Sequence, residues 1–87
     1  MITINYIENL KKKIIYRSKH RGSKEMDIIL GRFVHKYIDK FNDKELKELN
    51  SLLNIEDEVI YNWYIGKNSN KSIPETNVSI KLKNFKL

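Results

Sequence analysis

The feature that most constrains the fold is one apolar stripe in the middle of the chain. Between residues 26 and 41, large apolar side chains recur every three or four residues, which is the spacing of one face of an α-helix. The stripe consists of Met26, Ile29, Leu30, Phe33, Val34, Tyr37, Ile38 and Phe41. This spacing predicts an amphipathic helix over about residues 23–41, whose apolar face other elements must cover.

A weaker helical stripe precedes this segment. It runs through Tyr6, Ile7, Leu10, Ile14 and Ile15, and predicts a first helix that ends near His20. Gly22 then interrupts the pattern, as expected of a residue in the left-handed conformation just beyond a helix.

Two short helices are predicted after the central one. Asn42 and Glu45 have the spacing of a capping box and open a helix over about residues 43–53. Three acidic residues at 56–58 favour the positive end of a further helix over about residues 56–65, and Gly66 ends it.

The carboxyl-terminal segment follows a polar loop at residues 66–74 and has an ambiguous pattern. Val78, Ile80 and Leu82 alternate like a strand, whereas Val78, Leu82 and Phe85 would line a helix. A lone strand would have no partner, so a final helix is favoured.

These elements predict an all-α fold. The 87 residues suffice for one small domain, so we expect a compact single-domain bundle of about five short helices over residues 1–87. Its core is expected within residues 6–66, with residues 67–87 loosely attached.

The charge is unevenly distributed along the chain. The formal net charge is +6, and residues 1–24 contain seven Lys or Arg and one Glu, while residues 25–66 are acidic. A solvated basic face explains this better than a protein contact, and a nucleic-acid contact is least favoured, because no recognition helix is evident. The basic side chains are Lys11, Lys12, Lys13, Arg17, Lys19, Arg21 and Lys24, interleaved with Tyr16 and His20.

Several kinds of chemistry are not supported by the sequence. The chain has no cysteine and three glycines, too few for a phosphate-binding loop, and its longest apolar runs are two to three residues, against about 20 for a membrane span. His35 and Asp39 are expected to form a surface hydrogen bond rather than a metal site, and Trp63 to pack in the core. No catalytic, metal-binding or cofactor-binding residue is therefore predicted, and the chain is not expected to be an enzyme.

Polar residues are dense around the junction of the first two predicted helices. Gly22 would let a partner approach the backbone, and Arg21 and Glu25 would form charge-assisted bonds with it. A purely structural role is equally compatible, with Arg21 capping the first helix and Glu25 placed favourably in the next one. The candidate partner-binding residues are Arg17, Arg21, Gly22, Glu25 and Asp27.

The same junction carries a family resemblance. Residues 16–27, Tyr-Arg-Ser-Lys-His-Arg-Gly-Ser-Lys-Glu-Met-Asp, resemble the Arg-Gly-x-x-Glu motif of the small succinate dehydrogenase flavin-assembly factors. A second block, Asp57 followed by Ile-Tyr-Asn-Trp-Tyr-Ile-Gly at residues 60–66, resembles that family's Asp before a Leu-Tyr-x-Trp-Leu-x-Gly phrase. The resemblance covers about residues 10–66.

The resemblance implies an all-helical chaperone that binds the flavoprotein subunit of succinate dehydrogenase, or of fumarate reductase. It would promote covalent attachment of FAD to a histidine of that client while holding no cofactor itself. The motif would supply the client contact through Arg21, Gly22 and Glu25, with Arg17 and Asp27 as neighbours. The expected compartment is the bacterial cytoplasm, or the mitochondrial matrix in a eukaryotic source.

Two other functions remain open from the sequence. The runner-up is a basic regulatory or antitoxin-type module that binds nucleic acid or another anionic partner. A third interpretation, a protein that itself holds FAD, is disfavoured because no phosphate-binding loop is present.

Overall fold

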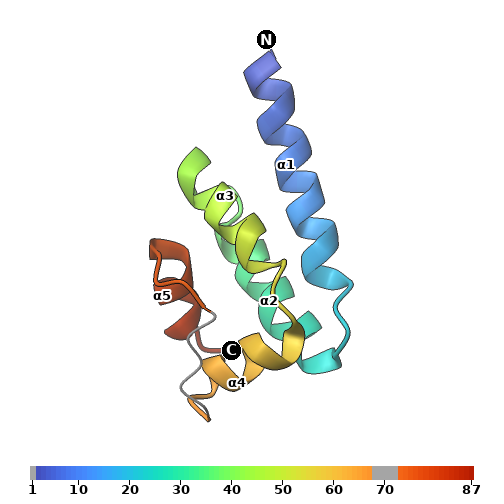
Figure 1. The fold of residues 1–87 in the computed structure, drawn as a ribbon. Helices are drawn as coiled ribbons and strands as arrows, with labels where there is room; N and C mark the ends of the chain where they lie inside the picture. Colours follow the sequence, from blue (N-terminus) through green and yellow to red (C-terminus); the bar gives the residue numbers. More distant parts are fainter. Residues whose placement is uncertain (1, 68–72) are drawn as a thin grey trace.

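The computed structural model describes residues 2–67 and 73–87, which form five α-helices (Figure 1). These residues contain no strand, so the all-α prediction is confirmed, as is the final helix. The helices are α1 (Ile2–Lys19), α2 (Lys24–Tyr37), α3 (Asp43–Leu52), α4 (Asp57–Tyr64) and α5 (Asn77–Lys83).

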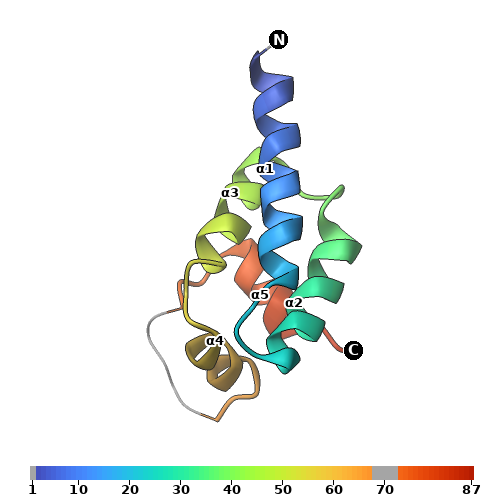
Figure 2. The same ribbon diagram turned by 90° about the vertical axis from the view of Figure 1, so that its right-hand side faces the viewer.

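The helices pack against one another in pairs. Helix α1 packs along α2, and α3 contacts both α1 and α5. The first turns of α1 extend beyond the other helices, whereas α4 lies across the opposite end of the bundle, next to the loop that joins α1 to α2 (Figures 1 and 2). This arrangement brings the α1–α2 loop and the α3–α4 loop together at one end.

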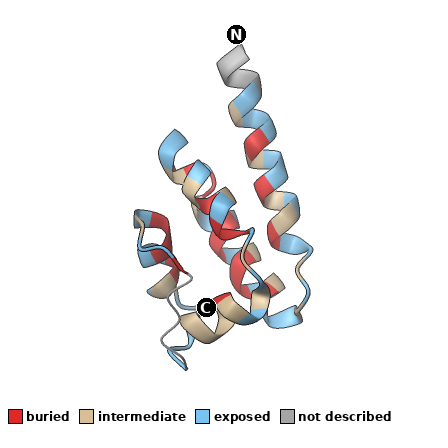
Figure 3. Cartoon of the chain, in the orientation of Figure 1, coloured by how far each residue is buried: buried red, intermediate tan, exposed pale blue. Residues whose placement is uncertain are grey.

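The core is built from most residues of the predicted apolar stripes, which face inward (Figure 3), although Tyr6 of the first stripe is 49 % exposed. Leu30 and Phe33 of α2 are fully buried, together with Ile14 of α1 and Leu49 of α3. Burial at this level stabilises a fold by about 1.5–3 kcal/mol for each large side chain. The central stripe therefore performs the predicted role.

Helix α2 is shorter than predicted. It ends at Tyr37 rather than near residue 41, and a turn follows in which Lys40 and Phe41 both donate backbone hydrogen bonds to the Tyr37 carbonyl. Phe41 is nevertheless buried and stacks on the Tyr37 ring. Phe41 keeps the apolar spacing of α2 although it lies beyond the helix, because the tight turn brings its side chain back to the side of the core that α2 faces.

Helix boundaries follow local capping chemistry. Asn42 and Glu45 form the predicted capping box of α3, and Gly66 ends α4 with a φ of 73°. A second capping box, between Thr76 and Ser79, starts α5. That pairing satisfies the first backbone donors of a short helix, which explains why the ambiguous segment is helical.

The carboxyl-terminal helix contributes directly to the core. Val78 and Leu82 are fully buried, and the Tyr64 hydroxyl donates a hydrogen bond to the Phe85 carbonyl. The looser attachment of residues 67–87 stays a prediction, and part of the predicted polar loop, residues 68–72, lies outside the described residues.

Within residues 2–67 and 73–87, no helix combines the length and apolar character needed to cross a membrane.

Candidate functional site

Arg21 links the two loops that meet at one end of the bundle. Its Nε donates to Asp57 Oδ1 at 2.7 Å, and its two terminal nitrogens donate to the carbonyls of Leu53 and Ile55 at 2.8 and 2.9 Å. The Arg21 side chain is only 9 % exposed. A guanidinium suits this position, because it carries several donors in one plane and stabilises the negative carboxyl end of α3.

Asp57 binds the α1–α2 loop with its other oxygen. The backbone N–H groups of Gly22 and Ser23 donate to Asp57 Oδ2 at 2.6 and 3.1 Å. Asp57 is also the first residue of α4, where a carboxylate interacts favourably with the helix dipole. One carboxylate therefore joins a side chain, two backbone amides and a helix start.

Arg17 makes a second set of contacts from α1 to the same region. It donates to Asn50 Oδ1 at 2.9 Å and to the Leu53 carbonyl at 3.2 Å, and it also donates to the Asn54 side chain. Arg17 and Arg21 thus share the Leu53 carbonyl at the end of α3. We call Arg17, Arg21, Gly22, Asp27 and Asp57 the junction cluster.

The backbone at Gly22 lies close to the Asp57 carboxylate. Among the described residues only Gly66 has a positive φ, so the left-handed conformation predicted for Gly22 is wrong. A Cβ at Gly22 would lie 3.3 Å from Asp57 Oδ2. Glycine is favoured because the carboxylate approaches the loop backbone closely.

The two acidic residues of the motif region differ in their surroundings. Asp27 Oδ1 accepts a hydrogen bond from the Arg21 backbone N–H at 2.6 Å, so it tightens the loop from the first turn of α2. Glu25 lies in the same turn but is exposed, and no hydrogen bond or ion pair joins it to the described residues. Gly22 is exposed as well.

The geometry therefore divides the five predicted partner-binding residues. Arg17, Arg21 and Asp27 use their polar side chains within the chain, and Gly22 is exposed although its N–H is bonded to Asp57. Only the exposed Glu25 carboxylate has no partner among the described residues. The structural alternative predicted that Arg21 caps the end of the first helix. Arg21 does cap a helix end, but that helix is α3 and not α1. Whether any of the five contacts a partner stays a prediction.

Sequence reasoning missed the far side of the cluster. Asp57 was placed at a helix start and in the second motif block, but no contact with the first block was predicted for it, and Asn50 and Asn54 were not singled out. Their distance along the chain hid them, because Arg17 and Asn50 are 33 residues apart. The available signal was the family resemblance, because the block that begins with Asp57 accompanies the Arg-Gly-x-x-Glu block in that family.

Two other expectations had different outcomes. Asp39 pairs with Lys11 at 3.3 Å instead of bonding to His35. Trp63 packs against the core as expected, although it is only partly buried, and the Lys83 ammonium lies 4.9 Å from the centre of its ring. In the described part of the chain, no group of three His, Cys, Asp or Glu residues could hold a metal ion.

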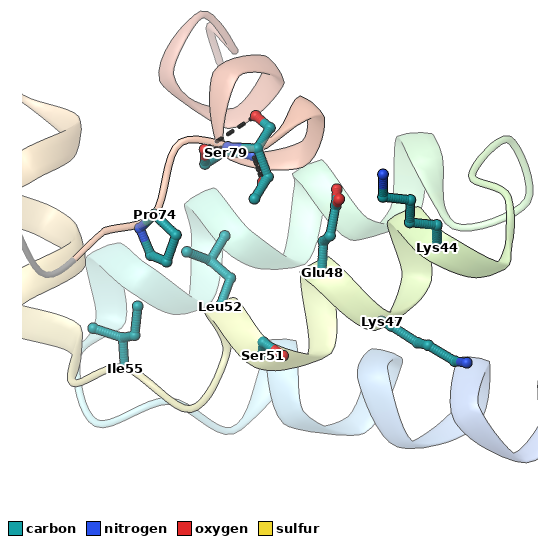
Figure 4. Close-up of a pocket in the computed structure, with 9 residues that line it drawn as sticks. Lys44, Lys47, Glu48, Ser51, Leu52, Ile55, Pro74 and Ser79 are labelled. Carbon is teal, nitrogen blue, oxygen red and sulfur yellow. Dashed lines mark hydrogen bonds between the residues drawn. The ribbon is translucent and has the colours of Figure 1, made fainter.

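A groove separate from the junction cluster lies between α3 and α5 (Figure 4). It has a volume of about 350 Å³ and combines apolar side chains such as Leu52 and Pro74 with the carboxylate of Glu48. Glu48 Oε1 is buried without a hydrogen-bond partner among the described residues. None of the five predicted partner-binding residues lines this groove.

The chain is similar to one protein family over most of its length. Residues 12–86 match the family described as flavinator of succinate dehydrogenase. "Succinate dehydrogenase assembly factor 2, mitochondrial" from Dictyostelium discoideum is 42 % identical over 64 residues, 74 % of this chain and 45 % of that protein. The protein of the same name from Saccharomyces cerevisiae is 36 % identical over 76 residues, 87 % of this chain and 47 % of that protein. The chain spans about half the length of the curated relatives it matches.

Proposed function

Because the chain belongs to the flavinator family of succinate dehydrogenase, we propose that it is an assembly factor that binds the flavoprotein subunit of that enzyme. In this proposal it promotes the covalent attachment of FAD to its client. The observation that carries the proposal is the family match over residues 12–86, which includes the whole junction cluster and all of α2 to α5.

The proposed client contact is the exposed part of the motif. Glu25 presents a carboxylate with no partner among the described residues, and Gly22, three residues earlier, is exposed although its N–H is bonded to Asp57. A client cation or amide would bind this carboxylate by a charge-assisted hydrogen bond. Arg17, Arg21 and Asp27 act as positioning residues, because their contacts hold the loop that contains Gly22 and leads to Glu25 at the start of α2.

The chain itself is proposed to be neither an enzyme nor a flavin carrier. It would hold the client in a competent state while the client's own residues form the bond to FAD. A fumarate reductase flavoprotein is a second client within the same proposal. We propose the bacterial cytoplasm as its compartment, or the mitochondrial matrix in a eukaryotic source.

The test is reconstitution with purified components. The apo flavoprotein subunit of succinate dehydrogenase is incubated with FAD, with and without the chain, and covalent flavin is measured by in-gel fluorescence of the denatured subunit. The proposal predicts a stable complex, faster flavin attachment and no flavin absorbance in the purified chain. No complex and no acceleration would overturn it, and binding of nucleic acid with a steep salt dependence would favour the regulatory-module alternative.

A further inference from the structure

An exposed aromatic pair lies at the end of α1, outside the junction cluster. The Tyr16 side chain is 63 % exposed and stacks on the His20 ring, with centroids 4.0 Å apart and planes inclined by 21°. His20 Nδ1 also lies 2.8 Å from the Tyr16 carbonyl oxygen, within hydrogen-bond distance. Both contacts hold the pair in one arrangement, so binding through it would cost little side-chain entropy.

Three lysines surround this pair on the same face of the helix. Lys12 and Lys13 precede Tyr16 by four and three residues, and Lys19 follows it by three, so all are its neighbours on the helix surface. All three are exposed and form no ion pair with the described residues, unlike Lys11, which pairs with Asp39. We call Lys12, Lys13, Tyr16, Lys19 and His20 the α1 outer face.

The α1 outer face is turned away from the rest of the bundle. Within residues 6–19 of α1, the buried side chains are Leu10, Ile14 and Ser18, which share the opposite side of the helix. In Figure 2, α1 runs in front of the other helices, which leaves this side open. The fold therefore does not explain why an aromatic anchor and three unneutralised lysines gather there.

We propose that the α1 outer face docks an acidic segment of the client flavoprotein, with Tyr16 as the apolar anchor and the lysines paired to carboxylates. This inference rests on the proposed function. An exposed, pre-ordered aromatic ring with a charged rim is typical of an interface hot spot, and unpaired charges of one sign select a partner of the other. The face also continues directly through His20 into the loop that contains Gly22 and leads to Glu25 at the start of α2.

A protein segment fits this face better than a nucleic acid. The five residues include no Asn or Gln, the side chains that read adenine, and no Arg, whose planar fork pairs with guanine through two fixed hydrogen bonds. Glu25 is exposed just beyond the adjoining loop. Its carboxylate would repel the phosphates of a nucleic acid that extended from the face along that loop. The same carboxylate would bind a cationic side chain on a protein surface of mixed charge.

The experiment measures the dissociation constant of the full chain for the purified flavoprotein subunit by calorimetry, at two salt concentrations. Tyr16→Ala should weaken binding at least about tenfold, and Tyr16→Phe should retain it. Lys12→Glu with Lys13→Glu should weaken binding and flatten its salt dependence. The matched controls, Tyr6→Ala on α1 and Lys67→Glu with Lys86→Glu elsewhere on the surface, should leave the dissociation constant within about twofold.

The outcomes separate this inference from the proposed function. If the unmodified chain does not bind the flavoprotein, the proposed function fails and this inference falls with it. If the unmodified chain binds but the face variants bind equally well, only the inference is wrong. If the chain binds a single-stranded RNA more tightly than the flavoprotein, and the lysine variant abolishes that binding, the face belongs to a nucleic acid and the inference is overturned.

Discussion

Arg21 and Asp57, 36 residues apart in the sequence, form the contact that closes one end of the bundle. The carboxylate bridges the Arg21 guanidinium and the backbone of the loop immediately after it, while the guanidinium also caps α3. Both side chains are largely withdrawn from solvent, with 9 % and 16 % of their surface exposed. The motif residue Arg21 is thus part of the fold's own scaffold.

Breaking this pair should destabilise the protein. Arg21→Ala and Asp57→Ala should each lower the free energy of unfolding by about 2–4 kcal/mol, because each leaves a partly buried charge without its partner. The double variant should cost less than the sum of the two, by about 1–3 kcal/mol. Urea unfolding followed by circular dichroism measures these values. Glu58→Ala, an exposed acid in the same turn as Asp57, is the control, and additive effects of the pair would contradict the contact.

Two glycines should respond oppositely to alanine. Gly22→Ala should destabilise the protein by about 1 kcal/mol, since its Cβ would press on Asp57 Oδ2, and the Asp57 carboxylate is already held in place by Arg21 at Oδ1 and by Ser23 at Oδ2. Gly31→Ala, within α2 and with nothing inside 4 Å of its Cβ, should stabilise it by about 0.5–1 kcal/mol. Thermal unfolding of both variants checks this, and a stabilising Gly22→Ala would show that the loop does not need the close approach.

The contribution of the Tyr64 hydroxyl to holding the carboxyl-terminal helix in place can be measured. Tyr64→Phe removes the hydrogen bond to the Phe85 carbonyl and should cost about 1 kcal/mol. Tyr61→Phe is the matched control, because no hydrogen bond of the Tyr61 hydroxyl is found among the described residues, and it should be nearly neutral. Hydrogen exchange of the α5 amides should speed up in Tyr64→Phe. Equal exchange in both variants would mean that residues 73–87 are held by other contacts.

Most of the fold was predictable because it depends on short-range patterns. The apolar spacing of residues 26–38 and the capping box at Asn42 are local signals, and both lead to the observed helices. The end of α2 was misplaced because a tight turn keeps Phe41 in the core, so burial there continues beyond the helix. The spacing of apolar residues alone does not distinguish a helix that continues to Phe41 from a helix that ends at Tyr37 and is followed by a tight turn.

The site was only half predictable, because its contacts are long-range. The sequence identified Arg21, Gly22 and Asp27 as a dense polar group, yet their partners lie on the α3–α4 loop and at the start of α4. Only packing brings these loops together. Glu25 was grouped with Arg21 by spacing, although the structure leaves it exposed while Arg21 is used within the fold.

The most direct test of this account is covalent flavin on the client subunit with Glu25→Ala, compared with Glu58→Ala. Both remove an exposed acid from the first turn of a helix, so each should change the free energy of unfolding by less than about 1 kcal/mol. We predict that Glu25→Ala reduces flavin attachment toward the level found without the chain, whereas Glu58→Ala matches the unmodified protein. Full flavin attachment with a stably folded Glu25→Ala would contradict the assignment of Glu25 as the exposed contact of the motif.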